Sequence, residues 1–426
     1  MCTALVVGNM IGSGVFLLPA SLAPYGGISI VGWLISAGGA VCLALVFARL
    51  GTLLPLIGGP YAYAREGFGD FGAFWIAWSY WIAILASNAA LAVAFVSYAT
   101  VFWPDLGTTP ALAAGAALAT LWVLTIVSVA GVHEAGRVQL VTTILKILPL
   151  AAIGTFGYLA FHAGNFRPFN PSGTGTLRAV SATVTLTLWA FTGLESGTVP
   201  AEDVHEPSRT IPRATVLGTL IAAAVYILCT VAVMGIIPRD TLAASTAPFA
   251  DAARVMWGPW GRGLIAAGAA VSCLGALNGW VLLSGQLPRA AALDGLLPAP
   301  LAGLNRRGAP AVGLVVSSVL ATIIIAMNYT KGLVEAFTFL ILLATLTTLL
   351  PYVFSSMTAI RLALRDGRAG RARAVGRLAV AAVAFLYSLW AIGGAGEDAI
   401  YWGFLLLMIG LPVYVFMRRH TPKPTG

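Results

Sequence analysis

The stretch VGNMIGSGVFLLP, residues 7–19, decides the fold of this chain. Apolar, helix-forming residues lead into Gly12-Ser13-Gly14, and apolar residues resume directly afterwards. A backbone break of this kind is costly inside a bilayer, because unpaired N–H and C=O groups in hydrocarbon lose their hydrogen bonds to water. Membrane proteins keep such breaks where the freed groups line a cavity and hold a ligand. The first question is therefore whether this stretch lies in a membrane.

The composition is that of a membrane protein. Of the 426 residues, 59% are hydrophobic and 9% are charged, whereas about 25% of the residues in an average soluble domain are charged. Many apolar runs reach the roughly 20 residues that cross a hydrocarbon core. The sequence therefore predicts an all-α polytopic membrane protein with one transmembrane domain over residues 1–426. The formal net charge of +9 does not indicate a nucleic-acid partner, because the basic residues lie in short loops between helices.

About twelve transmembrane helices are expected. In chain order they cover residues 2–22 (broken), 28–54, 71–102, 111–132, 138–160, 179–200, 214–237, 263–287, 311–327, 333–362, 378–392 and 400–417. A polar, glycine-rich connector at residues 57–70 joins the second helix to the third. Most of the 24 Lys and Arg residues fall in loops on one side of this topology. The positive-inside rule then places both termini in the cytoplasm. The expected location is a bacterial-type inner membrane.

A second break lies in the sixth expected helix, LWAFTGLESG at residues 188–197, where Gly193 and Gly197 flank Glu195. Paired glycine-interrupted helices in corresponding positions indicate an inverted-repeat transporter, although glycine alone also serves helix packing. The N-terminus of a half-helix offers N–H groups to an anion, and its C-terminus offers carbonyls to a cation. Two such breaks suit a zwitterion with a carboxylate at one end and an ammonium at the other.

Six motifs resemble those of the amino acid–polyamine–organocation transporters, and most closely their basic amino acid/polyamine antiporters, typified by the arginine/agmatine antiporter. They are GNMIGSGVFLLPASLAPYGGI, GGPYAYAREGFG, LWAFTGLES, EPSRTIPRA, GWVLLSGQ and DGLLP. The resemblance covers nearly the whole chain. It implies a five-plus-five inverted repeat, with residues 1–162 and 177–364 as the repeats and residues 375–418 as two additional helices. It also implies alternating access and often a homodimer.

The resemblance places the substrate at the two breaks. The Ser13 hydroxyl and the N–H groups near Gly14 would bind a carboxylate, while carbonyls near Trp189 and Thr192 would receive the amino group. The aromatic ring of Trp189 would close over the substrate, and aromatic rings also attract cations. The substrate-binding candidates are Asn9, Met10, Gly12, Ser13, Gly14, Asn88, Leu91, Trp189, Thr192, Trp280 and Ala344. For each of them, packing within the helix bundle is the alternative role.

Three apolar residues distinguish this expected pocket from that of an arginine antiporter. Leu91 and Ala344 stand where that antiporter has a methionine and a hydroxyl residue, and Ile84 also occupies a pocket position. The pocket is therefore apolar where a guanidinium would be held, which does not favour arginine as the substrate.

Tyr80, Lys146, Glu195 and Tyr352 are the candidates for gating and coupling. Glu195 lies inside an expected helix, where an acid is a proton carrier or gate element by default, and a protonated glutamate bonding between helices is the alternative. Lys146 lies about 12 Å along the fifth expected helix, too deep to reach the interface easily. In sodium-independent members of the superfamily a lysine sits in place of a sodium ion, which implies the same role for Lys146.

The sequence thus predicts a secondary transporter that exchanges amino acids or their amine products without sodium. A basic amino acid or a polyamine is the favoured substrate. The alternative is a proton-coupled amino acid permease with a broader or neutral substrate range. A channel is disfavoured by the broken helices, and a membrane enzyme would need clustered catalytic groups. No phosphate-binding loop and no metal-ligand spacing occurs, so we expect neither ATP-driven transport nor a metal or other cofactor.

Overall fold

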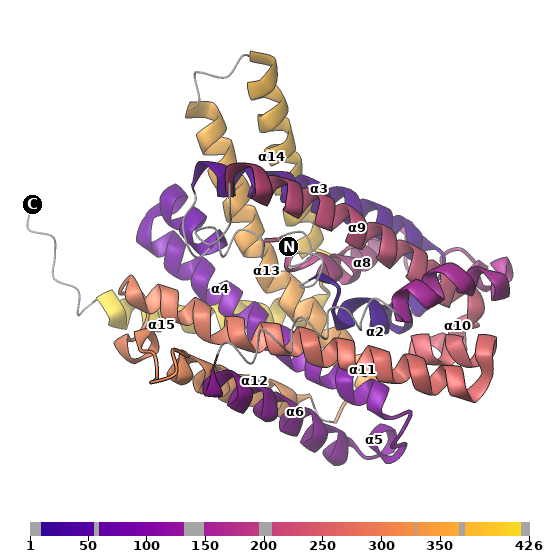
Figure 1. Ribbon diagram of the computed structural model, residues 1–426. Coiled ribbons are helices and arrows are strands. Elements are labelled where there is room, and N and C mark those ends of the chain that lie inside the picture. Colours follow the sequence, from indigo (N-terminus) through magenta and orange to yellow (C-terminus); the bar gives the residue numbers. More distant parts are fainter. Residues whose placement is uncertain are drawn as a thin grey trace, which may run out of the picture.

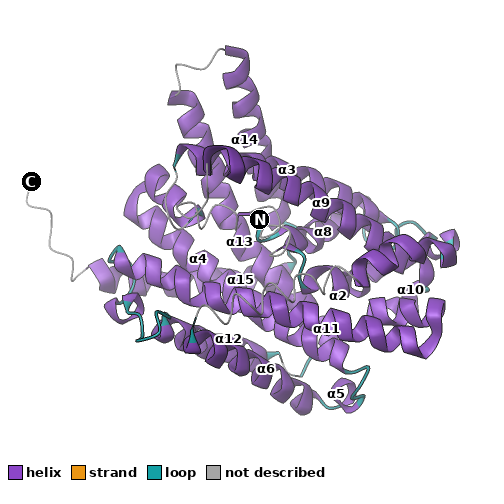
Figure 2. Cartoon of the chain, viewed as in Figure 1, coloured by secondary structure: helices purple, strands orange, loops and turns teal. Residues whose placement is uncertain are grey.

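The computed structural model describes residues 10–54, 59–131, 149–195, 207–328, 330–365 and 371–418, and these ranges contain helices and loops but no strand (Figure 2). Two predicted site residues, Asn9 and Lys146, lie outside the described residues, as does Gly197 of the second break. For Ser13 and Gly14 only the backbone is described.

The longer helices follow the expected order along the chain. They are α2 (Ser13–Leu22), α3 (Ile28–Leu53), α4 (Pro60–Ala99), α6 (Pro110–Ala130), α8 (Thr176–Leu188), α9 (Pro207–Ile236), α11 (Pro248–Leu293), α12 (Ala311–Met327), α13 (Leu333–Arg365), α14 (Arg371–Ile392) and α15 (Glu397–Arg418). Short elements connect them: α5 (Asp105–Thr108), α10 (Arg239–Ala243), η1 (Ala23–Tyr25), η2 (Gly157–Ala160), η3 (Ala163–Phe166), η4 (Trp189–Phe191) and η7 (Ala299–Ala302).

Eight helices within the described ranges are long and apolar enough to cross a membrane. Three further apolar helices are shorter: Val15–Tyr25, Pro149–Ala160 and Ala311–Met327. Together with α8, which leads into the second break, they coincide in position with the twelve expected membrane helices. The prediction of an all-α polytopic membrane protein is confirmed.

Two helix starts were predicted wrongly, and both errors have the same cause. The supposed connector at residues 57–70 is helical from Pro60, and the eighth membrane helix begins at Pro248 rather than at residue 263. Each helix bends at a glycine, Gly69 (φ 72°, ψ −166°) and Gly258 (φ 76°, ψ −163°). Other residues are strained at these angles, so glycine lets the chain turn and continue as helix. We call residues 60–68 the first arm and residues 248–257 the second arm.

The helices form two groups that meet around α4 and α13 (Figure 1). In one group α3 packs against α8, α9 and α14, and in the other α11 and α6 pack against α12. The central helix α4 contacts both α13 and α11, and the half-helix α2 contacts α8, α9, α11 and α13. The first break therefore lies where the two groups meet.

Small residues on α3 bring its neighbours unusually close. A Cβ atom at Gly32 would lie 2.4 Å from Oγ1 of Thr183 on α8, and one at Gly39 would lie 2.3 Å from the Tyr387 ring on α14. The hydroxyls of Ser36 and Thr187 add a hydrogen bond of 2.6 Å between α3 and α8. Close approach of this kind is the usual way in which membrane helices pack. It fixes α8, the half-helix that ends at the second break, against α3.

Candidate functional site

The second break is a closed turn between α8 and Glu195. The helix passes into the 3-10 turn η4, and the carbonyl of Trp189 then accepts hydrogen bonds from both the N–H group (3.1 Å) and the hydroxyl (2.7 Å) of Thr192. Gly193 follows with φ 100°, a backbone angle that residues with a side chain rarely adopt. The glycine is therefore needed where the helix stops. The predicted interruption of the sixth helix is present.

Glu195 joins this break to two long helices. Its side chain is fully buried. The hydroxyl of Tyr80 on α4 donates to Oε1 at 2.5 Å, and the hydroxyl of Tyr352 on α13 donates to Oε2 at 2.8 Å. The N–H group of Gly193 also donates to Oε2, at 3.1 Å. The structure thus brings together three of the four gating candidates around one carboxyl group, which we call the Glu195 lock.

The first break lies against α11 and α4. Gly12 precedes α2 with a non-helical backbone (φ −124°, ψ −144°), and because glycine has no side chain it cannot cap the helix through one. A Cβ atom at Gly12 would lie 2.9 Å from Cβ of Ala276 on α11 and 3.9 Å from a methyl carbon of Leu91 on α4. Met10, two residues before Gly12, is also buried. Gly12 therefore permits the break to approach the other group of helices.

Four predicted pocket residues share one face of α4. Tyr80, Ile84, Asn88 and Leu91 follow one another at helical spacings of four, four and three residues. All four are buried. Asn88 lies two turns, about 12 Å, from Tyr80 along the helix axis. This face therefore runs from the Glu195 lock to the first break, which Leu91 approaches.

The helix α13 supplies the facing side in antiparallel register. The Ser79 hydroxyl donates to the carbonyl of Thr347 at 2.6 Å, and the Thr358 hydroxyl donates to that of Tyr63 at 3.1 Å, so numbering rises along one helix as it falls along the other. Ala344 lies eight residues before the tyrosine of the lock and is fully buried. It therefore stands about 12 Å from that tyrosine, on the same face and in the same direction as the α4 pocket residues.

Several buried polar atoms have no hydrogen-bond partner among the described residues, and two of them belong to predicted substrate-binding residues. These two are Oδ1 of Asn88, whose side chain is 2% exposed, and Nε1 of Trp189, which is 5% exposed. Leaving such a group unsatisfied costs about 1–3 kcal/mol, so each calls for an explanation such as a ligand. The Trp189 ring packs edge-on against Phe337 of α13, with 5.4 Å between ring centres. The second break and the α4 face thus offer one acceptor and one donor to a substrate.

Trp280 is placed less directly. It is buried in α11, four residues after Ala276, and therefore one turn along the same helix face from the contact with Gly12. No hydrogen bond or ring contact within the described ranges joins it to either break. Its predicted role in substrate binding stays a prediction.

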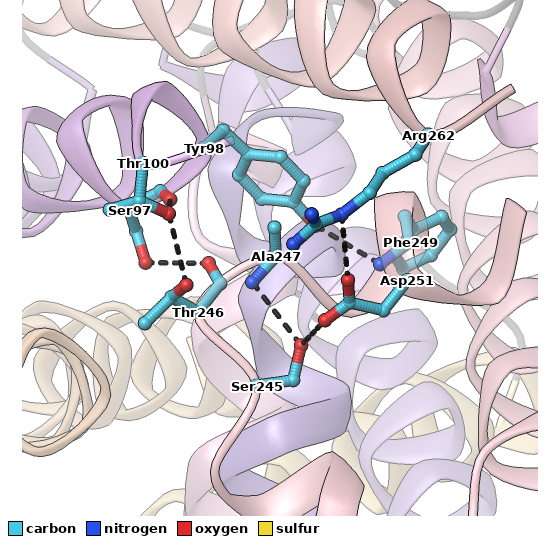
Figure 3. Close-up of polar contacts among 9 residues, drawn as sticks. All are labelled: Ser97, Tyr98, Thr100, Ser245, Thr246, Ala247, Phe249, Asp251 and Arg262. Atoms are coloured by element: carbon cyan, nitrogen blue, oxygen red, sulfur yellow. Dashed lines mark hydrogen bonds and ion pairs between the residues drawn. The ribbon is translucent and has the colours of Figure 1, made fainter. Parts of the chain in front are cut away.

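Sequence reasoning missed Tyr98, which connects the half-helix α2 to the rest of the molecule. The Tyr98 hydroxyl, at the end of α4, donates to the carbonyl of Phe16 in α2 at 2.7 Å and accepts from the N–H group of Phe249 at 3.3 Å. The Phe16 ring packs edge-on against both aromatic rings. Figure 3 shows Tyr98 reaching the start of α11. A tyrosine in an apolar helix gives no sequence signal of such contacts.

The chain is similar over its whole length to known membrane transporters. A family model described as amino acid permease matches residues 2–414. The putrescine transporter PotE of Haemophilus influenzae is 33% identical over 416 residues, which cover 97% of this chain and 95% of that protein. The cadaverine/lysine antiporter of Escherichia coli is 38% identical over 366 residues, covering 84% and 82%. The putrescine transporter PotE of Escherichia coli is 32% identical over 413 residues, covering 97% and 94%.

Proposed function

Because the chain belongs to the amino acid permease family, a family of multi-pass membrane transporters, we propose that it exchanges a basic amino acid for an aliphatic diamine across the inner membrane. Its relatives are named for putrescine and for cadaverine/lysine exchange. The observation that carries the substrate class is Oδ1 of Asn88, a buried acceptor with no partner in the described part of the chain, which an ammonium group would satisfy.

The two breaks would hold the amino acid end of the substrate. The first turn of α2 offers backbone N–H groups and the positive end of a helix dipole to a carboxylate. The carbonyl of Trp189 already accepts from Thr192, so the C-terminal end of α8 and η4 would attract the α-ammonium through its negative dipole end. A diamine has no carboxylate, so it would leave the α2 end unfilled. The amino acid would therefore occupy the carboxylate position at the first break, and the diamine would leave it empty.

The alkyl chain and the second ammonium group would lie along α4. Ile84, Leu91 and Ala344 offer apolar surface to methylene groups, and Asn88 offers its carbonyl oxygen to the far ammonium. A guanidinium has five N–H donors that need acceptors, and these apolar side chains supply none. We therefore propose lysine, ornithine and their diamine products as substrates rather than arginine.

The Glu195 lock would couple occupancy of the site to movement of the helices. The turn that contains Gly193 leads directly to Glu195, so a substrate that shifts this turn would also pull on Tyr80 and Tyr352. Those two hydroxyls belong to different long helices, α4 and α13. In this proposal Tyr80, Glu195 and Tyr352 transmit the presence of substrate to the bundle.

We also propose the five-plus-five repeat, with residues 1–162 and 177–364 as its halves and residues 375–418 as additional helices. The equal bends at Gly69 and Gly258 support it, because each lies about nine residues into the third helix of its half, after a proline start. Cytoplasmic termini are part of the same proposal. The positive-inside distribution of Lys and Arg supports them.

Purified protein in liposomes tests the proposed exchange. Liposomes loaded with lysine should take up labelled cadaverine, whereas empty liposomes should not, with protein-free liposomes as the control. Equal uptake into empty liposomes would overturn the proposal. Uptake into empty liposomes that requires an imposed pH gradient would instead establish the proton-coupled permease.

A further inference from the structure

The helices α4 and α11 begin in the same unusual way. Each starts with a short arm, bends at a glycine with matching dihedral angles, and carries an ion pair across the bend. In α4 the pair joins Nε of Arg65 to Oδ1 of Asp70 at 3.4 Å, and in α11 it joins Nε of Arg262 to Oδ1 of Asp251 at 3.1 Å. The acid and the base are exchanged between the two arms. The chain thus uses one construction twice.

The first arm is fastened to the far end of α11 by Asp294, the residue that follows that helix. The Tyr61 hydroxyl donates to Oδ2 of Asp294 at 2.6 Å, and Nη1 of Arg65 lies 2.8 Å from Oδ1. Both carboxylate oxygens are therefore engaged by residues of the first arm. We call this contact the first latch.

The second arm is fastened to the far end of α4 in the reciprocal manner (Figure 3). Tyr98 accepts from the N–H group of Phe249, the Ser97 hydroxyl donates to the carbonyl of Thr246 at 2.6 Å, and the hydroxyls of Thr100 and Thr246 lie 3.0 Å apart. These contacts join α4 to the arm and to the turn before it. We call them the second latch.

The last residue of each arm packs against a helix outside the α4–α11 pair. The ring of Phe68 packs at a tilt of 54° against Phe354 of α13, with 4.7 Å between ring centres, and Trp257 packs edge-on against Phe156 at 6.5 Å. The arms also form the covalent connections from the group containing α3 and α9 to α4 and α11. Movement of one group of helices against the other would therefore displace these arms.

We propose that the two latches open alternately and that their relative strength determines which side of the substrate site is accessible. Asp294 and Tyr98 are the positioning residues of the first and the second latch. The inference rests on the proposed transport function and on the proposed topology, in which the first latch is cytoplasmic and the second periplasmic. Both latches are formed in this structure. Tyr98 also bonds the carbonyl of Phe16, so the second latch acts directly on the half-helix α2.

The sign of each effect follows from the geometry. Weakening the first latch frees the cytoplasmic arm and favours the cytoplasm-open state, which lowers the fraction of protein that can bind substrate from the periplasm. Weakening the second latch has the opposite effect. Because apparent affinity scales with the fraction of the competent state, loss of one or two hydrogen bonds should change the side-specific KM by about 3- to 10-fold.

Two conservative variants separate the latches. Asp294→Asn keeps an acceptor for Tyr61 but removes the charge that holds Arg65, and Tyr98→Phe removes only a hydroxyl while keeping the aromatic ring. Arg65→Gln repeats the first test from the other side of the ion pair if Asp294→Asn does not fold. The matched controls are Asp240→Asn, which breaks the surface pair with Arg239, and Tyr401→Phe, which alters an exposed tyrosine.

Hydrogen–deuterium exchange on protein in nanodiscs measures the latches without any substrate. Asp294→Asn should raise exchange in residues 60–72 only, and Tyr98→Phe should raise it in residues 245–262 only. Unchanged exchange in both segments would overturn the latches even if transport is normal. If hydrogen–deuterium exchange changes as expected in the two variants but the protein transports neither lysine nor cadaverine, the latches are supported and the proposed function is wrong.

Transport in right-side-out and inside-out vesicles measures the sidedness. Asp294→Asn should raise the periplasmic KM and lower the cytoplasmic one, Tyr98→Phe should do the reverse, and the controls should change neither. Shifts of both variants in the same direction would overturn alternate opening.

Discussion

Glu195 is the residue on which the proposed coupling depends. Three donors, from Tyr80, Tyr352 and Gly193, meet its two oxygens. In Glu195→Gln one oxygen becomes an NH₂ donor, so at least one of these donors would face another donor. We expect the exchange rate to fall about tenfold, because leaving a buried donor without an acceptor costs about 1–3 kcal/mol. Initial rates of exchange in liposomes measure this.

Glu335→Gln is the matched control for this variant, because Glu335 lies exposed in the first turn of α13. Its rate should equal that of the unmodified protein. A Glu195→Gln variant that retains the full rate of exchange would show that the carboxyl group takes no part in coupling.

Asn88 provides the sharpest residue-scale test of the pocket. Replacing an unpaired buried polar group with an apolar one of similar size is nearly neutral or stabilising. Asn88→Leu should therefore leave the melting temperature of the substrate-free protein unchanged or raise it, and should abolish the stabilisation that added lysine or cadaverine produces. Thermal unfolding with and without substrate measures both effects.

Asn305 gives the contrasting control. Its side chain donates to the carbonyl of Val129 and accepts from the N–H groups of Arg307 and Ala309. Asn305→Leu should lower the melting temperature and keep the substrate-induced stabilisation. If Asn88→Leu behaves like Asn305→Leu, Asn88 holds the structure together and does not bind substrate.

At the level of single residues, the sequence identifies functional candidates only where an ionisable side chain or a backbone break is energetically unfavourable in a membrane. Glu195 and the glycine breaks are costly in hydrocarbon, so the sequence alone marks them as functional candidates. Tyr98 and Asp294 are ordinary residues for a membrane helix and a loop, and their importance lies in partners that are 82, 151 and 233 residues away along the chain. Contacts over those distances leave no periodic pattern in a single sequence.

At the scale of elements, the approach of α2 to α11 depends on the absence of a side chain at Gly12. A Cβ atom there would lie 2.9 Å from Cβ of Ala276, closer than real Cβ atoms approach other heavy atoms. Gly12→Ala should therefore reduce the exchange rate, and the second change Ala276→Gly should restore much of it by making room. Rates of the two single variants and the double variant measure the coupling. Additive losses in the double variant would contradict the close contact.

The bends at Gly69 and Gly258 make a second prediction at this scale. At both positions an added Cβ atom would meet no described heavy atom within 4 Å, so only the backbone angle opposes substitution. Gly69→Ala and Gly258→Ala should each destabilise the protein by about 1–3 kcal/mol. Thermal unfolding measures the loss of stability.

Gly38→Ala and Gly115→Ala are the controls for these bends. Both glycines lie within helices and also have open space around them. Because alanine favours helix more than glycine does, these variants should be neutral or slightly stabilising. Equal behaviour of all four variants would mean that the bends do not depend on glycine.

The membrane helices themselves are largely predictable from the sequence, because length and hydropathy mark them. The bends are not. Residues 57–70 contain glycine and charged side chains, which are typical of a connector, whereas the structure continues as helix on both sides of Gly69. The related pattern of aromatic, glycine, variable residue, aromatic and glycine occurs at residues 68–72 and again at residues 257–261. That repetition is the sequence signal that could have revealed the paired arms.

At the scale of the whole molecule, the fold divides into two groups of helices with the proposed substrate site where they meet. The first break contacts α11 and α4, and the Glu195 lock contacts α4 and α13. Movement of either group therefore changes both ends of the site together. Such an arrangement suits a carrier that changes between its inward-facing and outward-facing states only with substrate bound, which is the defining property of an exchanger.

The most direct measurement of this central claim is the exchange stoichiometry in one preparation of liposomes. Labelled lysine is placed inside, cadaverine with a different label is placed outside, and both labels are followed together with no imposed ion gradient. Strict exchange predicts one molecule of lysine released for each molecule of cadaverine taken up, with both fluxes reduced equally in Glu195→Gln. Cadaverine uptake that proceeds without lysine release would contradict it.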